Sequence, residues 1–125
     1  MASVLIVEDN LETLRLFQKS MTKKGNHLVS TAATLTEASS LLDQIAFQVI
    51  VLDLEMPEGM GLDLYRAYAE RLEQQNTIVI AVSAEANYRR ACTEAGIRHF
   101  FLKPIMPSSL ANIVSELAEA CGVAN

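Results

Sequence analysis

Short apolar runs alternate with longer amphipathic segments along the chain. Three of the runs, 4–7, 49–52 and 78–82, are continuously apolar and rich in β-branched residues. Runs of this kind indicate strands that are covered on both faces, as in a parallel sheet. Two weaker candidates, 27–32 and 99–102, mix polar with apolar residues, which is typical of the edges of such a sheet.

The segments between these runs carry apolar residues at the spacing of amphipathic helices. A fourth helix is expected over about 85–95, with Gly96 at its carboxyl end because glycine readily adopts the left-handed conformation there. The positions expected to face a core, helix by helix, are Leu11, Leu14, Phe17 and Met21; Ala38, Leu41, Leu42 and Ile45; Leu62, Tyr65, Ala69 and Leu72; Ala91, Cys92 and Ala95; and Leu110, Ile113, Val114, Leu117, Ala118 and Cys121.

Five strands that alternate with five helices predict an α/β fold. Right-handed crossovers then place helices on both faces of a five-stranded parallel sheet. If the three continuous runs form the central strands and the two mixed runs form the edges, the strand order is 2-1-3-4-5. This order is the flavodoxin-like, doubly wound arrangement.

Composition narrows the class of protein. A length of 125 residues fits one domain over 1–125, and an apolar fraction of 50% is enough for one buried core. The apolar runs are far shorter than the roughly 20 residues of a membrane span. A net charge of −5 argues against nucleic acid as a partner. Cys92 and Cys121 lack the spacing of a metal site, and acids precede any basic residue at the amino end, so free thiols in a cytoplasmic protein are expected.

Polar residues follow four of the predicted strands. Glu8 and Asp9 follow the first, Asp53 the third, Ser83 the fourth, and Lys103 the fifth. Because the carboxyl ends of parallel strands meet at one edge of the sheet, where ligands bind in this fold, these side chains should lie together.

The chemistry of this set predicts phosphoryl transfer. Three carboxylates held close together resist ionisation unless a cation joins them, and oxygen ligands of this kind favour Mg²⁺. A metal-bound carboxylate beside a hydroxyl and an ammonium group can attack phosphorus while the cations hold the charge of the transferred oxygens. Asp53 is the expected nucleophile.

Each residue also has a structural interpretation when it is taken singly. Asp9 could cap a helix together with Glu12, and Ser83 could cap the fourth helix. Asp53 could simply end a strand, and Lys103 could be an ordinary solvated lysine. The joint pattern favours a site, because four suitable positions stand at the ends of four strands that the topology brings together.

This set resembles the site of the response-regulator receiver family, the CheY-like domains of two-component signalling. The resemblance extends from Val4 to about Cys121 and includes the motif Val-Leu-Asp-Leu-Glu-Met-Pro around Asp53. It implies an acidic pair, a phosphoacceptor, a switch hydroxyl followed by alanine, and a lysine before proline. The bond between Lys103 and Pro104 is expected to be cis, so that the turn aims the ammonium group at Asp53.

The resemblance also implies roles for individual residues. Asp9, Asp53 and the backbone carbonyl of Glu55 would bind Mg²⁺, with Glu8 acting through water. Ser83 and Lys103 would bind the phosphoryl oxygens.

The resemblance further implies a switch. The aromatic switch position falls on Phe100, whose ring would move inward with Ser83 and remodel the face made by the fourth helix, fifth strand and fifth helix. Phenylalanine has no hydroxyl, so a switch that depends on a tyrosine hydrogen bond is not expected, and a core ring that never moves is the alternative. The chain also has Met60 where receivers often have an acidic residue.

Two further acids should tune the lifetime of a phosphorylated state. Glu55 and Glu85 stand two residues after the acceptor and the switch hydroxyl. We expect Glu55 to repel the phosphoryl group, because two negative charges about 4 Å apart repel by a few kcal/mol at effective protein dielectrics. Neutralising Glu55 should then favour the phosphorylated state.

The resulting prediction is a signalling receiver and not an enzyme that turns over an external substrate. Asp53 would accept a phosphoryl group from a phosphohistidine of a sensor histidine kinase or a histidine phosphotransfer protein, and a downstream effector would read the switched face. Neither a membrane nor nucleic acid is expected as a direct partner. The alternative is a receiver-like interaction module that signals without phosphorylation, and detection of phosphate on Asp53 separates the two.

Overall fold

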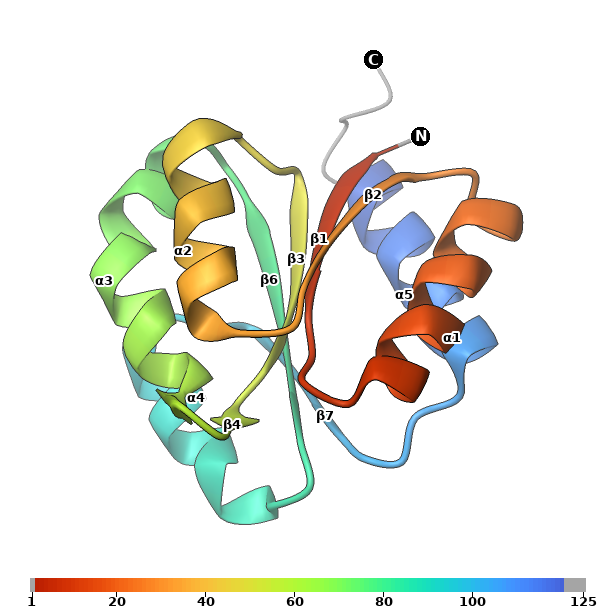
Figure 1. The fold of residues 1–125 in the computed structure, drawn as a ribbon. Helices are drawn as coiled ribbons and strands as arrows, with labels where there is room; N and C mark the ends of the chain where they lie inside the picture. Colours follow the sequence, from red (N-terminus) through yellow and green to blue (C-terminus); the bar gives the residue numbers. More distant parts are fainter. Residues whose placement is uncertain (1, 121–125) are drawn as a thin grey trace.

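The computed structural model describes residues 2–120 and has one five-stranded parallel sheet between two layers of helices (Figure 1). The order is β2-β1-β3-β6-β7, which is the predicted order 2-1-3-4-5 once the strands of the sheet are counted along the chain. The flavodoxin-like prediction is therefore confirmed. The strands of the sheet are β1 (Ser3–Val7), β2 (Leu28–Ala32), β3 (Val49–Asp53), β6 (Ile78–Ser83) and β7 (His99–Leu102).

Five helices connect these strands. Figure 1 shows α1 and α5 on one face of the sheet, and α2, α3 and α4 on the other. In the described residues no helix is both long and apolar enough to span a bilayer. The helices are α1 (Leu11–Lys23), α2 (Leu35–Gln44), α3 (Gly61–Gln74), α4 (Arg89–Ala95) and α5 (Pro107–Ala120).

The sheet separates the core into two apolar clusters, because successive side chains of a strand point to opposite faces. On the side of α1 and α5, Val4 and Ile6 of β1 pack with Phe17 of α1. On the other side, Leu5 and Val7 of the same strand join the cluster beneath α2, α3 and α4. The central strand β3 is buried along its whole length, as its continuous apolar sequence predicts.

Several predicted positions differ in detail. The fourth helix is shorter than expected, because a 3-10 turn (Ala86–Tyr88) precedes α4. Leu11 and Ile45 were expected to face the core, but they are 54% and 41% exposed. Both stand at helix ends, outside the stripe that each helix buries. Cys92 is a buried free thiol, as predicted, whereas Cys121 lies outside the described residues.

A small hairpin beyond β3 was not predicted. It pairs β4 (Glu55–Met56) with β5 (Gly59–Met60) in antiparallel register. Strands of only two residues have no periodicity to detect, so the pattern of apolar and polar positions does not predict them. The hairpin leads directly from Asp53 into α3, so it sets where Glu55 lies.

Candidate functional site

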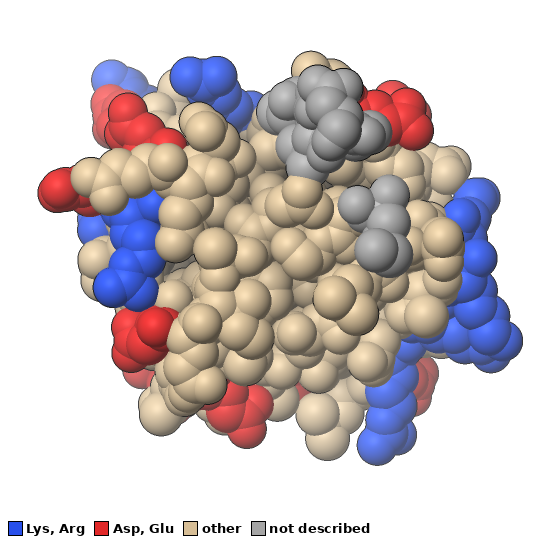
Figure 2. Space-filling view, turned by 90° about the horizontal axis from the view of Figure 1, so that it is seen from above, with Lys and Arg blue, Asp and Glu red and all other residues tan. Residues whose placement is uncertain are grey.

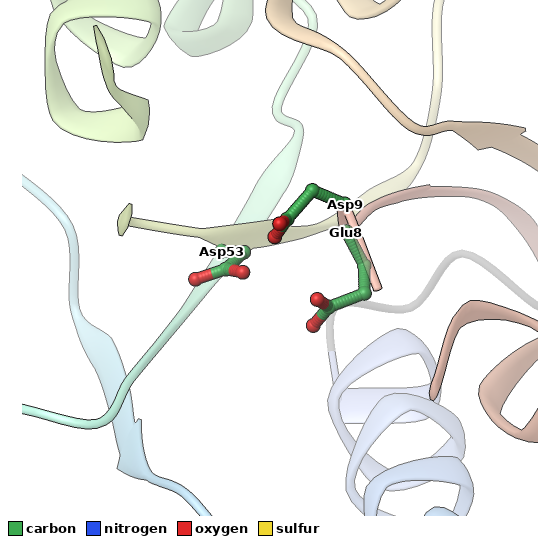
Figure 3. Close-up of side chains that lie close together, drawn as sticks. All are labelled: Glu8, Asp9 and Asp53. Atoms are coloured by element: carbon green, nitrogen blue, oxygen red, sulfur yellow. The ribbon is translucent and has the colours of Figure 1, made fainter. Parts of the chain in front are cut away.

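Three carboxylates meet at the carboxyl edge of the sheet (Figure 3). Glu8 and Asp9 follow β1, and Asp53 is the last residue of the neighbouring strand β3. One oxygen from each of the three lies within 4.8 Å of the other two. Glu8 and Asp53 are each only 3% exposed, so the acids that the sequence placed at one edge form a largely buried cluster.

Lys103 joins two of these carboxylates. Its Nζ donates to Glu8 Oε1 at 3.1 Å and to Asp53 Oδ2 at 3.0 Å. The backbone N–H of Lys103 donates to the carbonyl oxygen of Ser83 at 2.8 Å, which fixes the turn after β7 beside the end of β6. The bond between Lys103 and Pro104 is cis, as predicted, and the ammonium group points to the acids.

Burial and charge oppose one another at this cluster. Burial, together with the nearby charge of Glu8, raises the pKa of Asp53 to about 7 against the opposing effect of Lys103. Burial alone would lower the pKa of Lys103, but its hydrogen bonds to Asp53 and Glu8 raise that pKa overall. The arrangement therefore keeps the ammonium group charged and leaves the carboxylates in need of further positive charge.

The three carboxylates differ in how many protein donors their oxygens have, and this difference fits the binding of a hard cation. Both oxygens of Glu8 have protein donors, since Oε2 accepts from the N–H of Asn10 at 3.1 Å. Asp53 Oδ1 accepts a longer bond, 3.2 Å, from the N–H of Glu55. Within the described residues Asp9 makes no hydrogen bond or ion pair, and it is the most open of the three acids. Carboxylate oxygens arranged in this way suit Mg²⁺ coordination through Asp9 and Asp53.

Asp9 does not cap a helix, so the structural interpretation of this residue is wrong. The cap of α1 is Asn10, whose Oδ1 accepts from the N–H of Thr13 at 3.0 Å. The residue beside Asp9 therefore satisfies the helix terminus and leaves the Asp9 carboxylate available.

Ser83 is fully buried and does not cap α4, which begins at Arg89. Its Oγ accepts from the N–H of Glu85 at 2.9 Å and donates to Glu55 Oε1 at 2.9 Å. The N–H of Ala84 also donates to Glu55 Oε1, at 3.2 Å. The sequence placed Ser83 at the edge, but gave no signal that the Glu55 side chain crosses from the hairpin to bind it.

Phe100 lies in β7 with its side chain only 8% exposed. The guanidinium group of Arg89, the first residue of α4, stands over the ring at 4.7 Å from its centre. The ring thus occupies an inward position in the structure, and its expected movement stays a prediction. The contact with Arg89 was not predicted, because a 3-10 turn displaces the start of α4 from its expected place.

Gly61 brings α3 against the candidate acceptor. Its N–H donates to the carbonyl oxygen of Leu54 at 2.7 Å. A Cβ added to Gly61 would overlap the backbone carbonyl oxygen of Asp53, so only glycine fits without a shift of one of the two segments.

Comparison with known proteins gives a family match. The response regulator receiver domain matches residues 4–115 of the chain. One relative is the transcriptional regulatory protein CitT of Bacillus subtilis, which is 22% identical over 95% of this chain and 53% of its own length. The chain spans between 5% and 53% of the first three curated relatives, so each of these is a longer protein.

Solved structures agree with the fold. A CheY-like receiver domain protein of Methanospirillum hungatei has a TM-score of 0.88, with 20% identity, and the match covers 100% of this chain and 99% of that one. The BeF₃-activated receiver domain of DrrB from Thermotoga maritima has a TM-score of 0.79 and 26% identity, over 95% and 98% of the two chains.

Proposed function

Because the chain belongs to the response regulator receiver domain family, we propose that it accepts a phosphoryl group on Asp53 from a phosphohistidine. The donor would be a sensor histidine kinase or a histidine phosphotransfer protein. The observation that carries the proposal is the double contact of Lys103 Nζ with Glu8 and Asp53, beside the open carboxylate of Asp9.

The transfer is a displacement at phosphorus. An oxygen of Asp53 attacks, a new O–P bond forms as the P–N bond of the phosphohistidine breaks, and the electron pair of that bond returns to the imidazole nitrogen. Lys103 already contacts Asp53 Oδ2 and holds positive charge where the transferred oxygens arrive. Water later attacks the phosphorus, which releases inorganic phosphate and restores the carboxylate.

Asp9, Asp53 and the backbone carbonyl of Glu55 are the proposed ligands of Mg²⁺, and Glu8 would act through water while it holds Lys103. When bound, the ion supplies positive charge that offsets both the acids and the phosphoryl oxygens. The need for this charge is consistent with the burial that raises the pKa of Asp53 to about 7.

The proposed output is a change of surface and not turnover of an external substrate. Ser83 would bind a phosphoryl oxygen, and the environment of Phe100 would change with it, which alters the face of α4, β7 and α5 for a downstream effector. Receiver domains are signalling modules, and several curated relatives of this chain are kinases or transcriptional regulators.

The test is intact-mass measurement of the purified chain with Mg²⁺ and a small phosphodonor. Wild type should gain a phosphoryl group, Asp53→Asn should gain none, and Asp9→Ala should need more Mg²⁺. If a folded wild-type chain gains no phosphoryl mass while an established receiver does under the same conditions, the proposal fails. That result would favour the alternative of an interaction module that signals without phosphate.

A further inference from the structure

The carboxylate of Glu55 binds the end of β6. One oxygen, Oε1, accepts from both Ser83 Oγ at 2.9 Å and the N–H of Ala84 at 3.2 Å. The other oxygen, Oε2, is buried and has no hydrogen-bond partner in the described residues. A half-satisfied buried carboxylate is costly, so this contact is not explained as an optimised structural bond.

Ser83 and Ala84 offer the donors that an oxygen of a group on Asp53 would use. Ser83 follows Val82, which pairs with Asp53 in the register of β3 and β6. Its hydroxyl and the next backbone N–H both point to a single anionic oxygen, that of Glu55. A carboxylate oxygen and a phosphoryl oxygen are both anionic acceptors, and each makes charge-assisted hydrogen bonds with such donors.

We propose that the Glu55 carboxylate is an internal competitor that occupies the phosphoryl-oxygen donors of Ser83 and Ala84. This inference rests on the proposed phosphorylation of Asp53. A phosphoryl group gains these donors only when Glu55 releases them, so the contact lowers the population of the phosphorylated, switched state. The effect is a direct exchange of one acceptor for another, and it differs from repulsion by overall negative charge.

Three variants separate the effect of the hydrogen bonds that Glu55 accepts from the effect of its negative charge. Glu55→Ala removes the competing acceptor, whereas Glu55→Gln keeps an oxygen at that place without the charge. Glu85→Gln is the matched control, because Glu85 lies two residues beyond Ser83, is exposed, and its carboxylate makes no hydrogen bond or ion pair among the described residues. All of these changes leave the backbone carbonyl of Glu55 in place.

The first measurement is the affinity for beryllofluoride, a phosphoryl mimic, in the presence of Mg²⁺. The chain has no Trp, so the titration is followed by NMR of the Ala84 amide. Loss of a charge-assisted acceptor predicts binding about tenfold tighter for Glu55→Ala, with Glu55→Gln between it and wild type. Glu85→Gln should stay within about twofold of wild type, because it removes charge without a contact, and the lifetime effect expected of Glu85 concerns hydrolysis, which this equilibrium titration does not measure.

The second measurement needs no phosphoryl mimic. Amide hydrogen exchange of Ala84 in the protein alone should be about tenfold faster in Glu55→Ala and unchanged in Glu85→Gln, because Glu55 is the one acceptor of that N–H among the described residues. Equal exchange in wild type and Glu55→Ala would overturn the proposed contact.

The outcomes also separate this inference from the proposed function. If wild type and all variants bind, but Glu55→Ala binds no tighter than wild type, the competitor is refuted while the phosphorylation site stands. If Glu85→Gln tightens binding as much as Glu55→Gln, overall charge explains the effect and the competitor is again refuted. If no variant binds beryllofluoride and none is phosphorylated, the proposed function fails, and with it the competition.

Discussion

Lys103 holds two buried carboxylates with one ammonium group. Glu8 Oε1 lies 3.1 Å and Asp53 Oδ2 lies 3.0 Å from its Nζ, and both acids are nearly inaccessible to water. One positive charge cannot neutralise two negative ones, so the cluster is strained electrostatically even with the lysine in place. The cluster therefore lowers the stability of the fold relative to one with fewer buried acids at this edge.

Replacing Lys103 tests this arrangement. Lys103→Met keeps most of the apolar stem but leaves both acids without their cation, and breaking a buried ion pair in this way is strongly destabilising. We expect the free energy of unfolding to fall by about 2–3 kcal/mol at neutral pH without Mg²⁺. Urea denaturation followed by circular dichroism measures the change. An unchanged midpoint would show that the two acids do not depend on Lys103.

Replacing the partner of Lys103, Asp53, should change the free energy of unfolding in the opposite direction. Asp53→Asn removes one of the two carboxylates that share Lys103, so it should raise the free energy of unfolding by about 1 kcal/mol or more under the same conditions. When the two changes are combined, Asp53→Asn should stabilise the Lys103→Met variant by more than it stabilises wild type, because Asp53 then has no ammonium group to offset its burial and the charge of Glu8. Additive effects of the two changes would contradict a direct coupling between these side chains.

Strand ends could be predicted at this scale, but side-chain directions could not. Asp53 and Lys103 are placed by the topology of the sheet, so the apolar runs that alternate with helical segments were enough to find them. Asn10 as the cap of α1, and Glu55 as the acceptor from Ser83, depend on local loop geometry. The spacing of apolar residues along the chain does not predict that loop geometry.

At the scale of elements, the junction between β3 and α3 is closely packed. Gly61 donates to the carbonyl oxygen of Leu54, and the backbone of Asp53 occupies the space that a Cβ on Gly61 would need. The first turn of α3 therefore packs against the backbone that carries the candidate acceptor.

The central strands were predicted correctly because their sequences are continuously apolar. The short hairpin and the late start of α4 depend on local turns, which the spacing of apolar residues does not predict.

Gly61→Ala should disturb both stability and function. The added methyl group must push α3 away from Asp53, and overpacking of this kind costs about 1–3 kcal/mol. We also expect slower phosphorylation of Asp53 by a small donor, measured by intact mass over time. Gly96→Ala is the control, because it strains a positive φ of 109° at the end of α4 but leaves Asp53 untouched. Equal phosphorylation rates in the two variants would refute the role of the junction.

His27 connects the residue that precedes β1 to α5. Its Nδ1 accepts from the N–H of Ala2 at 3.1 Å, which leaves Nε2 to donate to Ser115 Oγ at 2.9 Å. This pattern requires the neutral ring, and burial lowers the pKa of His27 below its usual value. The prediction that 27–32 forms an edge strand was right except at this residue, because β2 begins at Leu28.

The pH dependence of stability follows from that pKa. The unfolded chain binds a proton at the ordinary histidine pKa of about 6.5, whereas the folded chain resists it, so the contribution of His27 is lost as pH falls below that value. We expect the stability difference between wild type and His27→Gln to shrink between pH 7 and pH 5, in denaturant titrations at each pH. A difference that grows toward pH 5 would mean that the folded protein favours the charged ring.

For the whole molecule, charge is distributed unevenly. Figure 2 looks at the end of the sheet where the strands begin, and it shows charged side chains mainly around the margin. On the side of α1, Arg15, Lys19, Lys23 and Lys24 make no ion pair in the described part of the chain. The carboxyl edge instead concentrates Glu8, Asp9 and Asp53 in a chain whose net charge is −5. A divalent cation that binds there should therefore stabilise the entire fold.

Thermal unfolding with and without Mg²⁺ tests this link between site and fold. Binding to the native state alone adds RT ln(1 + [L]/Kd), which is about 1.4 kcal/mol at ten times Kd, so the wild-type midpoint should rise and EDTA should reverse the rise. Asp9→Asn should lose most of the gain, because Asp9 is the acid of the cluster whose oxygens have no protein partner in the described part of the chain. Glu12→Gln removes an equal charge from the exposed first turn of α1 and should keep the wild-type response. Equal responses in Asp9→Asn and Glu12→Gln would mean that Mg²⁺ acts by general screening of an acidic protein and has no site at the carboxyl edge.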